Sequence, residues 1–254
     1  MPYFTKEEIT DTKRQEIKQL LSGYAGRNIR DFFAANLVNR YQTQVFSTAD
    51  KAETKVCDLG TASGIFADQL GQLGFKNIRG VDLDDYLSDE AKHFFKDFRI
   101  ADLSRDPIPW PDGFFDIVTA WCVLPHLENP HFCVREVNRV LKPGGLFILS
   151  IPHILSRASV NYFLRHGDFA RYHSSGNHIS VFSPGVFKNT VLRYFEAVAM
   201  EYLFDPRSFS GVKGRLRRFI LTWSYNNSRL RGYFSKAWGY NQIWVLRKYK
   251  AEIT

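Results

Sequence analysis

The stretch VCDLGTASG, residues 56–64, runs from an apolar segment through an aspartate into a loop of small residues. Such an apolar run is typical of a buried parallel strand, and Asp58 stands where that strand would end. Gly60 and Gly64 let a ligand approach the backbone closely, at the start of the helix that follows. The stretch therefore predicts a ligand-binding turn between a strand and a helix.

The spacing of this loop does not fit two common classes of ligand. A loop for nucleoside triphosphates needs a lysine and a serine or threonine after its last glycine, whereas Gly64 is followed by Ile65 and Phe66. A dinucleotide loop has the pattern G-x-G-x-x-G, whereas Gly60, Ala62 and Gly64 stand at every second position. A third class of ligand is therefore indicated.

The chain on both sides of the loop alternates short apolar runs with helical patterns. Strands are predicted over 55–59, 78–82, 98–101, 115–121, 145–151, 196–204 and 240–248. Helices are predicted over 5–22, 28–46, 63–73, 86–96, 130–141 and from Ser183–Pro184 to about 195. Continuous apolar strands separated by helices predict an α/β fold, with a parallel sheet covered on both faces.

The composition is that of a globular protein with one α/β domain and additions to it. The chain has 254 residues, of which 44% are hydrophobic and 24% charged. Its cysteines, Cys57, Cys122 and Cys133, are not paired with histidines at metal-ligand spacing, so no metal site is predicted. The N-terminal sequence lacks the apolar core of a signal peptide, and the longest apolar stretch, 144–155, is too short to span a bilayer. We expect a cytoplasmic protein.

Four motifs together resemble one family. The pattern D-x-G-x-G-x-G, with alanine in the middle place, is similar to the first motif of class I S-adenosylmethionine (SAM) dependent methyltransferases. Asp82 after the second strand, ADLSRDPIPWPDGFFDIVTAWCVLPHL at 101–127 and REVNRVLKPGGLFILSIP at 135–152 resemble the same family in order and spacing. The resemblance covers roughly residues 50–204 and the final strand. It implies a Rossmann-like sheet of seven strands, mostly parallel, with helices on both faces and an antiparallel last strand.

The resemblance also implies SAM as the cofactor, with S-adenosylhomocysteine as its product. Asp82 would accept hydrogen bonds from the ribose hydroxyls, and Asp102 from the adenine amino group. The cofactor-binding residues that the resemblance implies are Asp58, Leu59, Gly60, Thr61, Ala62, Ser63, Gly64, Asp82, Leu83, Asp102, Leu103, Trp121 and Cys122. An aspartate after a strand can also serve only as a cap, and for Asp102 that alternative stays open.

Two motifs that the chain lacks help to narrow the class of methyl acceptor. Nucleic-acid amino methyltransferases of this fold carry Asn/Asp-Pro-Pro-aromatic after the fourth strand, where this chain has WCVLPHL at 121–127. Cytosine-C5 enzymes need a cysteine that follows a proline, and no cysteine here does so. These differences disfavour nucleic acid and favour a small-molecule or glycan acceptor.

His126, just after the fourth strand, resembles the histidine of the family's small-molecule branch. In that role it is a catalytic general base or a contact to the acceptor, and histidine titrates near neutral pH, which suits either. The alternative is a residue at the start of a helix that bonds only to backbone. The sequence leaves both interpretations open.

A second resemblance concerns residues 151–192 and a subgroup near polysaccharide and O-antigen biosynthesis. It rests on Pro152, Arg157, Phe163–Leu164, Gly167, His178–Ile179 and Ser183–Pro184. In that subgroup the segment covers the acceptor pocket, so we expect a lid over 153–182. Tyr172, His173 and His178 are its candidate substrate-binding residues, and a surface position in the lid is the alternative for each.

The excess of eight positive charges equals the contribution of one segment, 207–236, which lies in an insert predicted over 205–239 before the last strand. Its basic residues, with no acidic one between the first and last, are Arg207, Lys213, Arg215, Arg217, Arg218, Arg229, Arg231 and Lys236. Leu216, Phe219, Ile220 and Trp223 share one helical face. Contact with a membrane or another anionic surface, contact with nucleic acid, and packing on the sheet or a partner subunit all stay open.

The predicted organisation is an N-terminal helical cap over 1–50 and a SAM-binding methyltransferase domain over 51–254. The predicted function is O-methylation of a small-molecule, sugar or lipid-linked glycan hydroxyl. An RNA or protein methyltransferase that uses the basic insert is one alternative. A SAM-binding scaffold without turnover is another, because motifs for a cofactor do not by themselves establish a reaction.

Overall fold

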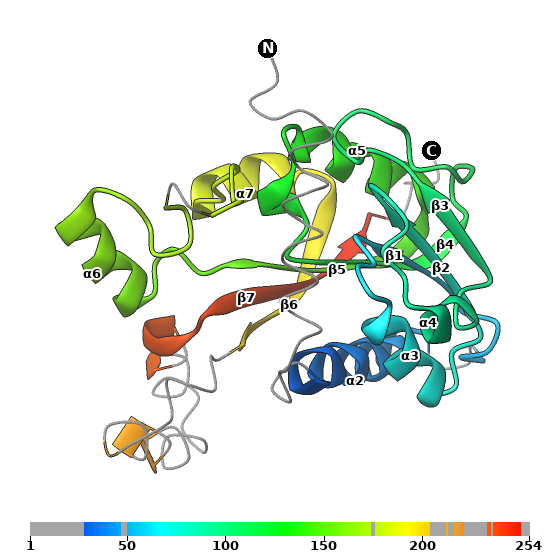
Figure 1. Ribbon diagram of the computed structural model, residues 1–254, viewed down its shortest axis with the longest axis horizontal. Coiled ribbons are helices and arrows are strands. Elements are labelled where there is room, and N and C mark those ends of the chain that lie inside the picture. Colours follow the sequence, from blue (N-terminus) through cyan, green and yellow to red (C-terminus); the bar gives the residue numbers. More distant parts are fainter. Residues whose placement is uncertain are drawn as a thin grey trace.

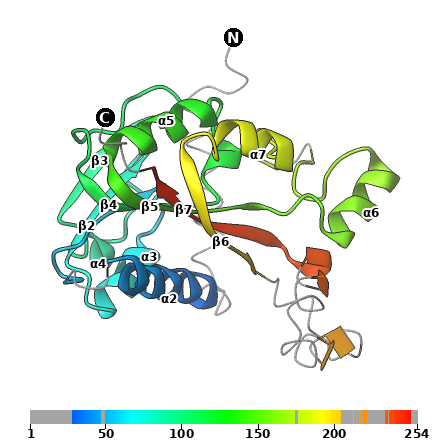
Figure 2. The same ribbon diagram turned by 180° about the vertical axis from the view of Figure 1, so that it is seen from behind.

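A seven-stranded sheet with helices on both faces forms the body of the computed structural model (Figures 1 and 2). The structure describes residues 28–46, 50–173, 176–203 and 236–249, with residues 212, 216, 217, 219, 220, 233 and 234. The strands are β1 (Lys55–Leu59), β2 (Asn77–Asp82), β3 (Asp97–Ile100), β4 (Phe115–Trp121), β5 (Leu141–Pro152), β6 (Phe195–Leu203) and β7 (Asn241–Lys248). Their order across the sheet is β3-β2-β1-β4-β5-β7-β6.

Strand direction confirms the predicted fold class. The strands from β3 to β5 are parallel, and β7 is antiparallel to both of its neighbours, β5 and β6. After β1 the chain builds one side of the sheet, and from β4 onward it builds the other. Ligands of open α/β sheets bind at such a switch point, beyond the carboxyl ends of the strands. The loop after β1 lies at this point.

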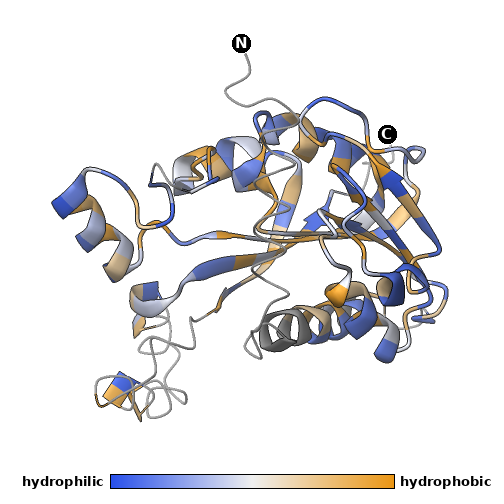
Figure 3. Cartoon of the chain, in the orientation of Figure 1, coloured by the Kyte–Doolittle hydropathy of each residue, from blue (hydrophilic) through white to orange (hydrophobic). Residues whose placement is uncertain are grey.

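Two pairs of helices cover the faces of the sheet. Residues of α2 (Asn28–Val45) and α3 (Ile65–Gln72) pack in one hydrophobic cluster, and residues of α5 (Pro130–Val140) and α7 (Pro184–Thr190) pack in the other. Figures 1 and 2 show these pairs on opposite sides of the strands. In Figure 3 the ribbons of α5 and α7 carry both hydrophobic and hydrophilic residues, as expected for helices with one face on a sheet.

The sheet is buried on both faces, which explains the continuous apolar runs of the sequence. Phe147 and Leu149 of β5 enter the cluster under α5, whereas Leu146 and Ile148 enter the cluster under α2. All four side chains are fully buried. Successive residues of a strand point to opposite faces, so a strand covered on both sides needs apolar residues throughout.

The segment predicted as a helix over 86–96 is helical only in α4 (Asp89–Lys92). Ser88 caps its start by accepting from the Ala91 N–H at 3.2 Å. The helix ends early because the chain turns Phe95 onto Gly80, where an added Cβ would lie 2.7 Å from the ring. Lys96 N–H then donates to the Ile78 carbonyl at 2.8 Å, which leads the chain into β3.

Other segments differ from the sequence-based prediction or lie outside the described residues. The helix from Ser183 ends at Thr190, five residues early, because the chain turns before β6 begins at Phe195. The lid segment contains a helix that was not predicted, α6 (Arg157–His166), and a short helix, η1 (Leu124–His126), follows β4. The predicted helix 5–22 and most of the basic insert lie outside the described residues.

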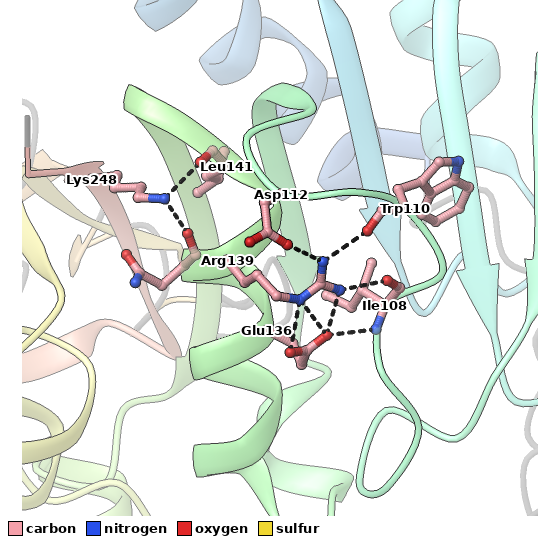
Figure 4. Close-up of polar contacts among 8 residues, drawn as sticks. Ile108, Trp110, Asp112, Glu136, Arg139, Leu141 and Lys248 are labelled. Atoms are coloured by element: carbon pink, nitrogen blue, oxygen red, sulfur yellow. Dashed lines mark hydrogen bonds and ion pairs between the residues drawn. The ribbon is translucent and has the colours of Figure 1, made fainter. Parts of the chain in front are cut away.

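Arg139 fastens the Pro-rich loop before β4 to α5 (Figure 4). Its guanidinium donates to the carbonyls of Ile108 at 2.8 Å and Trp110 at 2.9 Å. It also pairs with Glu136 at 2.7 Å and Asp112 at 2.8 Å. Glu136 accepts in turn from the Ile108 N–H at 3.0 Å. These motif residues therefore stabilise the fold at a distance from the ligand-binding edge.

No helix in the described part of the chain is both long enough and apolar enough to cross a membrane.

Candidate active site

The loop after β1 contains three residues in the left-handed region. These are Gly60 at φ 68°, Ala62 at φ 49° and Gly64 at φ 83°. A Cβ at Gly60 would lie 2.7 Å from Val123 Cγ2, and a Cβ at Gly64 would lie 2.5 Å from Ala91 Cβ. Both glycines are therefore required by packing as well as by backbone shape. Ala62 has this conformation despite a steric cost of about 1–2 kcal/mol.

Asp58 ends β1 in the interior, with 2% of its surface exposed. Thr119 of β4 is its direct partner in the sheet and donates from Oγ1 to Asp58 Oδ1 at 2.8 Å. A buried carboxylate needs such donors to remain charged. Thr119 was not among the predicted site residues, although it is the one polar residue within an otherwise apolar stretch of β4. Leu59, predicted beside Asp58, has its side chain in the core.

Asp82 joins the end of β2 to the same loop. Its Oδ2 accepts from the Ala62 N–H at 2.8 Å, and its Oδ1 accepts from the Leu83 N–H at 2.7 Å. The left-handed turn at Ala62 is what points that N–H at the carboxylate. Asp82 therefore orders the loop in addition to any contact with a ligand.

Asp102 follows β3 in a turn that its own side chain stabilises. Oδ1 accepts from the Ser104 N–H at 2.9 Å, and Oδ2 lies 3.4 Å from Nε of Arg105. Leu103 beside it is buried, with 6% of its surface exposed. The side chain of Asp102 therefore caps this turn, which corresponds to the alternative role that the sequence left open. A ligand amino group would have to share the carboxylate with Arg105.

Cys122 leaves the tip of β4 in the left-handed region, at φ 56°. A non-glycine residue rarely adopts this conformation, and such residues concentrate at functional sites. Its N–H donates to Ser150 Oγ at 3.0 Å, and its Sγ accepts from Asn241 Nδ2 at 3.2 Å. Trp121 before it packs edge to face with Phe66, with ring centroids 5.4 Å apart. The β4 tip is thus held by the ends of β5 and β7.

Asn241 links this tip to the lid segment. It is 1% exposed, and its Oδ1 accepts from the Arg171 guanidinium. Arg171 also stacks on the Tyr240 ring, 4.4 Å from its centroid. Neither residue was predicted as part of the site. No local motif marks them, because the contact joins segments 70 positions apart in the chain.

The structure brings His126, His178 and Tyr172 together. The rings of His126 and His178 are 4.4 Å apart, and those of His178 and Tyr172 are 5.3 Å apart. His126 Nδ1 lies 3.0 Å from the carbonyl oxygen of Asn177. The Pro125 carbonyl accepts from the Ile179 and Ser180 N–H groups at 2.8 and 3.0 Å. The lid is therefore bonded directly to the short helix that carries His126.

His178 and Tyr172 are both neutral at pH 7. Burial and the nearby charge of Arg171 lower the pKa of His178 to about 4. Burial likewise raises the pKa of Tyr172. His178 Nδ1 lies 2.7 Å from the Arg171 carbonyl, and the Tyr172 hydroxyl donates to the Ser180 carbonyl at 3.3 Å. Since a carbonyl only accepts, Nδ1 of His178 carries the proton.

The third predicted lid residue, His173, is exposed, and its charge adds to the effects that lower the pKa of His178. The thiols of Cys57 and Cys133 are buried, which raises their pKa, for Cys133 to about 12. Neither is therefore a nucleophile at neutral pH.

Within the described ranges, no group of three or more His, Cys, Asp or Glu side chains is arranged to hold a metal ion.

A pocket lies next to the segment that contacts His126, His178 and Tyr172. It is lined by Glu128, Asn129, Pro130, His131, Ser180, Val181, Phe182 and Val186. None of the predicted cofactor-binding residues lines it, so its position does not match the loop and acids described above. It shares Ser180 with the lid contacts of Tyr172.

Two buried polar atoms at the loop and the β4 tip test whether these residues fit SAM. Thr61 Oγ1 and Trp121 Nε1 are buried, and neither has a hydrogen-bond partner in the described structure. Buried polar groups are nearly always paired, so such atoms indicate that a polar ligand belongs beside them. SAM offers acceptors and donors in its ribose and its amino-acid group. The residues therefore fit the cofactor.

Comparisons with known proteins agree with this geometry. Residues 57–149 match the family described as a methyltransferase domain, a range that runs from Asp58 through His126 into β5. A ribosomal protein L11 methyltransferase from Clostridium perfringens is 38% identical over 103 residues, which are 39% of this chain and 32% of that protein. A ubiquinone biosynthesis O-methyltransferase from Pseudomonas aeruginosa is 32% identical over 110 residues, 40% of this chain and 46% of that protein. The chain thus spans about a third to a half of these relatives.

Solved structures share the fold across most of the chain. A SAM-dependent methyltransferase from Mesorhizobium loti has a TM-score of 0.51 at 16% identity, over 81% of this chain and 96% of that one. The cyclase SpnF has a TM-score of 0.53 at 17% identity, over 86% of this chain and 82% of that one. Identities this low show the fold alone, and the cyclase illustrates that a fold does not fix a reaction. The matched range and the strand order lead to one conclusion: residues 57–149 match the methyltransferase-domain family, within a chain that has the fold of class I SAM-dependent methyltransferases.

Proposed function

We propose that this protein transfers a methyl group from SAM to a hydroxyl of a small molecule, a sugar or a lipid-linked glycan. The observation that carries the proposal is the contact of 3.0 Å between His126 Nδ1 and the Asn177 carbonyl oxygen. Because that oxygen only accepts, Nδ1 holds the ring proton, and the neutral ring has its lone pair on Nε2. A hydroxyl must lose a proton as it is methylated, and Nε2 is the atom proposed to take it.

Residues at the ends of different strands are proposed to bind different parts of the cofactor. Asp82 would hold the ribose, Asp102 and Leu103 the adenine, and Asp58 with the loop from Gly60 to Gly64 the amino-acid end. Trp121 and Cys122 would form the floor. SAM supplies the electrophilic methyl group when bound.

Positioning is proposed as the main contribution of the chain to the rate. Holding a nucleophile in line with the group that it attacks can supply several kcal/mol of the barrier reduction. His126 stands on η1, directly after the β4 tip, and Asn177 fixes the orientation of its ring. Tyr172 and His178 are proposed to bound the acceptor beside it. His173, exposed at the edge of the lid, is proposed to contact the acceptor only at its periphery.

The proposed domain roles are those indicated by the sequence. Residues 153–182 act as a lid over the acceptor, residues 205–239 are a basic insert before the last strand, and residues 1–50 are an N-terminal cap. We propose a cytoplasmic protein whose insert contacts an anionic surface, such as the inner face of a membrane. A protein or RNA acceptor held by the insert, and a SAM-binding scaffold without turnover, are the outcomes that the tests below are designed to detect.

The first test replaces the proposed base. His126→Ala should lower kcat by about 10²- to 10⁴-fold, the usual contribution of a general base, and should leave the affinity for SAM unchanged. The matched control is His93→Ala, an exposed histidine beyond α4, which should change neither value. Turnover by His126→Ala within twofold of wild type would contradict the assigned base.

The second test identifies the class of acceptor. The full-length protein is incubated with SAM labelled in its methyl group and with hydroxyl compounds, total RNA or ribosomal protein in parallel. Calorimetry with SAM and S-adenosylhomocysteine accompanies it. Label in the hydroxyl compounds supports the proposal, and label only in RNA or protein rejects it in favour of that acceptor. Tight binding of both cofactor forms without any transfer would indicate the scaffold.

A further inference from the structure

A row of five rings leads from His126 to the surface of the molecule. The ring centroids are 4.4 Å apart for His126 and His178, 5.3 Å for His178 and Tyr172, 6.4 Å for Tyr172 and Phe169, and 4.9 Å for Phe169 and Phe163. Aromatic rings at these separations contact one another. Phe163 belongs to α6, so the row connects the proposed base to that helix.

The side chains of the row carry no charge of their own, although the Arg171 guanidinium lies near His178 and Tyr172. As described above, His178 and Tyr172 direct polar atoms onto the carbonyls of Arg171 and Ser180. Both side chains are neutral at pH 7. Phe169 and Phe163 have no polar atoms at all. A ligand lying along the row would therefore meet an apolar surface, whose burial contributes roughly 25 cal/mol per Å².

The outer end of the row lies open on α6. Phe163 is 43% exposed and Leu164 is 76% exposed. Ser159 is the one residue of α6 that is buried, so the helix adds little to the core. Figures 1 and 2 both show α6 standing apart from the sheet and its covering helices. Packing among the described residues therefore does not account for these apolar side chains.

We infer that the methyl acceptor is an amphiphile, an alcohol or phenol with an apolar tail. Its hydroxyl would lie at His126, and its tail would follow Tyr172 and Phe169 to Phe163 and Leu164 on α6. The inference rests on the proposed function and narrows its substrate class. It follows from the continuity of the row, which joins a hydroxyl-directed base at one end to uncovered apolar side chains at the other.

Tail length is the variable that tests this inference. Hexyl, heptyl and octyl β-D-glucosides, each below its micelle concentration, are titrated into the full-length protein with S-adenosylhomocysteine present. Each added methylene should tighten binding about two- to fourfold, up to the value for a fully buried methylene. The double variant Phe163→Ser and Leu164→Ser should lose most of this dependence, with octyl glucoside weakened at least tenfold. Both positions are exposed, so folding should be preserved.

The matched control is Ile100→Ser, a 55% exposed isoleucine at the far edge of the sheet. It should leave all three affinities unchanged. Affinities that ignore tail length, or that depend on it equally in the double variant, overturn the inference. Suppose that methyl transfer to a hydroxyl requires His126 while its rate depends neither on tail length nor on Phe163. In that case the inference fails and the proposed function stands. If tail-dependent binding holds but His126→Ala transfers methyl normally, the assigned base fails instead.

Discussion

At the scale of single residues, the carboxylates of the site order the loop that surrounds them. Asp82 accepts from the N–H of Ala62, whose left-handed backbone is otherwise unfavourable. The acid and the strained residue therefore depend on each other. A ligand that bonds to Asp82 meets a carboxylate already fixed in place, so little conformational entropy is lost on binding.

Asp82→Ala should weaken the binding of S-adenosylhomocysteine by at least tenfold, because it removes the acceptor for the loop and for the ribose together. A lost bond to a charged group contributes about 1.5–3 kcal/mol. Isothermal titration calorimetry measures the change. Asp89→Ala is the control, since its side chain is 96% exposed. Equal affinity of Asp82→Ala and wild type would show that the cofactor does not contact this strand end.

His178 should make the protein less stable in acid. Its pKa is about 4 in the folded chain, against 6.5 for an unperturbed histidine. Between these values the unfolded chain binds a proton that the folded chain does not, so the free energy of unfolding falls as the pH drops from 6.5 to 4. Above pH 6.5 the group has no effect.

His178→Gln should remove this contribution. The loss of stability between pH 7.5 and pH 4.5 should be smaller in the variant by about 1–2 kcal/mol, after allowance for solvent screening. Urea unfolding at the two pH values measures it. The same loss in both proteins would place the ring of His178 in solvent instead.

At the scale of elements, the turn between β1 and α3 is set by glycine packing. Gly64→Ala should destabilise the fold by about 3 kcal/mol, since it adds both a left-handed Cβ and a contact of 2.5 Å with Ala91. Gly113→Ala is the control: φ is 60° there, and nothing lies within 4 Å of an added Cβ. The Gly113→Ala change should lower the free energy of unfolding by only about 1 kcal/mol. Chemical denaturation gives both values, and equal losses would mean that backbone conformation alone decides.

The clamp at Arg139 holds the Pro-rich loop on α5 through two carbonyls and two carboxylates. Arg139→Gln should cost about 2–3 kcal/mol, because buried carbonyls and Glu136 lose charged donors. Arg99→Gln is its counterpart, a 58% exposed arginine paired with Asp97 two residues away, and should cost under about 0.5 kcal/mol. Thermal unfolding followed by circular dichroism compares them. Similar melting temperatures would remove the structural role of Arg139.

The strands, and the helices α2, α3 and α5 that pack on the sheet, could be predicted from the sequence, whereas α6, which stands apart from it, could not. β1 and β4 have the predicted bounds because strands buried on both faces are uninterrupted apolar runs. α6 was missed because its apolar residues, Val160, Phe163 and Leu164, have no core to face. Its ends do carry signals: Ser156 caps Ser159 N–H at 3.2 Å, and Gly167 ends the helix at φ 74°.

The contacts that join the β4 tip to β5, β7 and the segment around Arg171 could not be predicted, for a different reason. Cys122 and Asn241 are 119 positions apart, and only the antiparallel insertion of β7 brings them together. The acids and the loop could be predicted because each follows its own strand within a short motif. Asn241 and Arg171 stand in none of the quoted family motifs, so their role depends on the complete tertiary structure.

At the scale of the whole molecule, the last strand completes the sheet from within. β7 lies between β5 and β6, and β6 pairs with β7 as its one neighbour in the sheet. A chain that ends at Tyr240 should therefore lose cooperative unfolding, because β6 loses every ladder bond. Calorimetry and limited proteolysis test this.

The comparison for that truncation is Lys248→Met, which keeps β7 and removes only the bonds from Nζ to the carbonyls of Leu141, at 2.8 Å, and Asn138. It should fold, with a melting temperature a few degrees lower. A truncated chain that unfolds as cooperatively as Lys248→Met would show that the remaining strands form a stable sheet alone.

The pairing of Leu203 with Asn241 makes the connection between β6 and β7 a suitable place for a replacement segment. These residues end β6 and begin β7, they lie opposite each other, and Tyr240 N–H donates to the Leu203 carbonyl at 2.7 Å. Residues 204–240 thus leave and rejoin the sheet at one point, on the edge that carries the β4 tip. We therefore expect that a connection of another length or composition, placed between Leu203 and Asn241, would leave the strand register unchanged. Engineers could use this junction to give one cofactor-binding sheet new acceptor preferences.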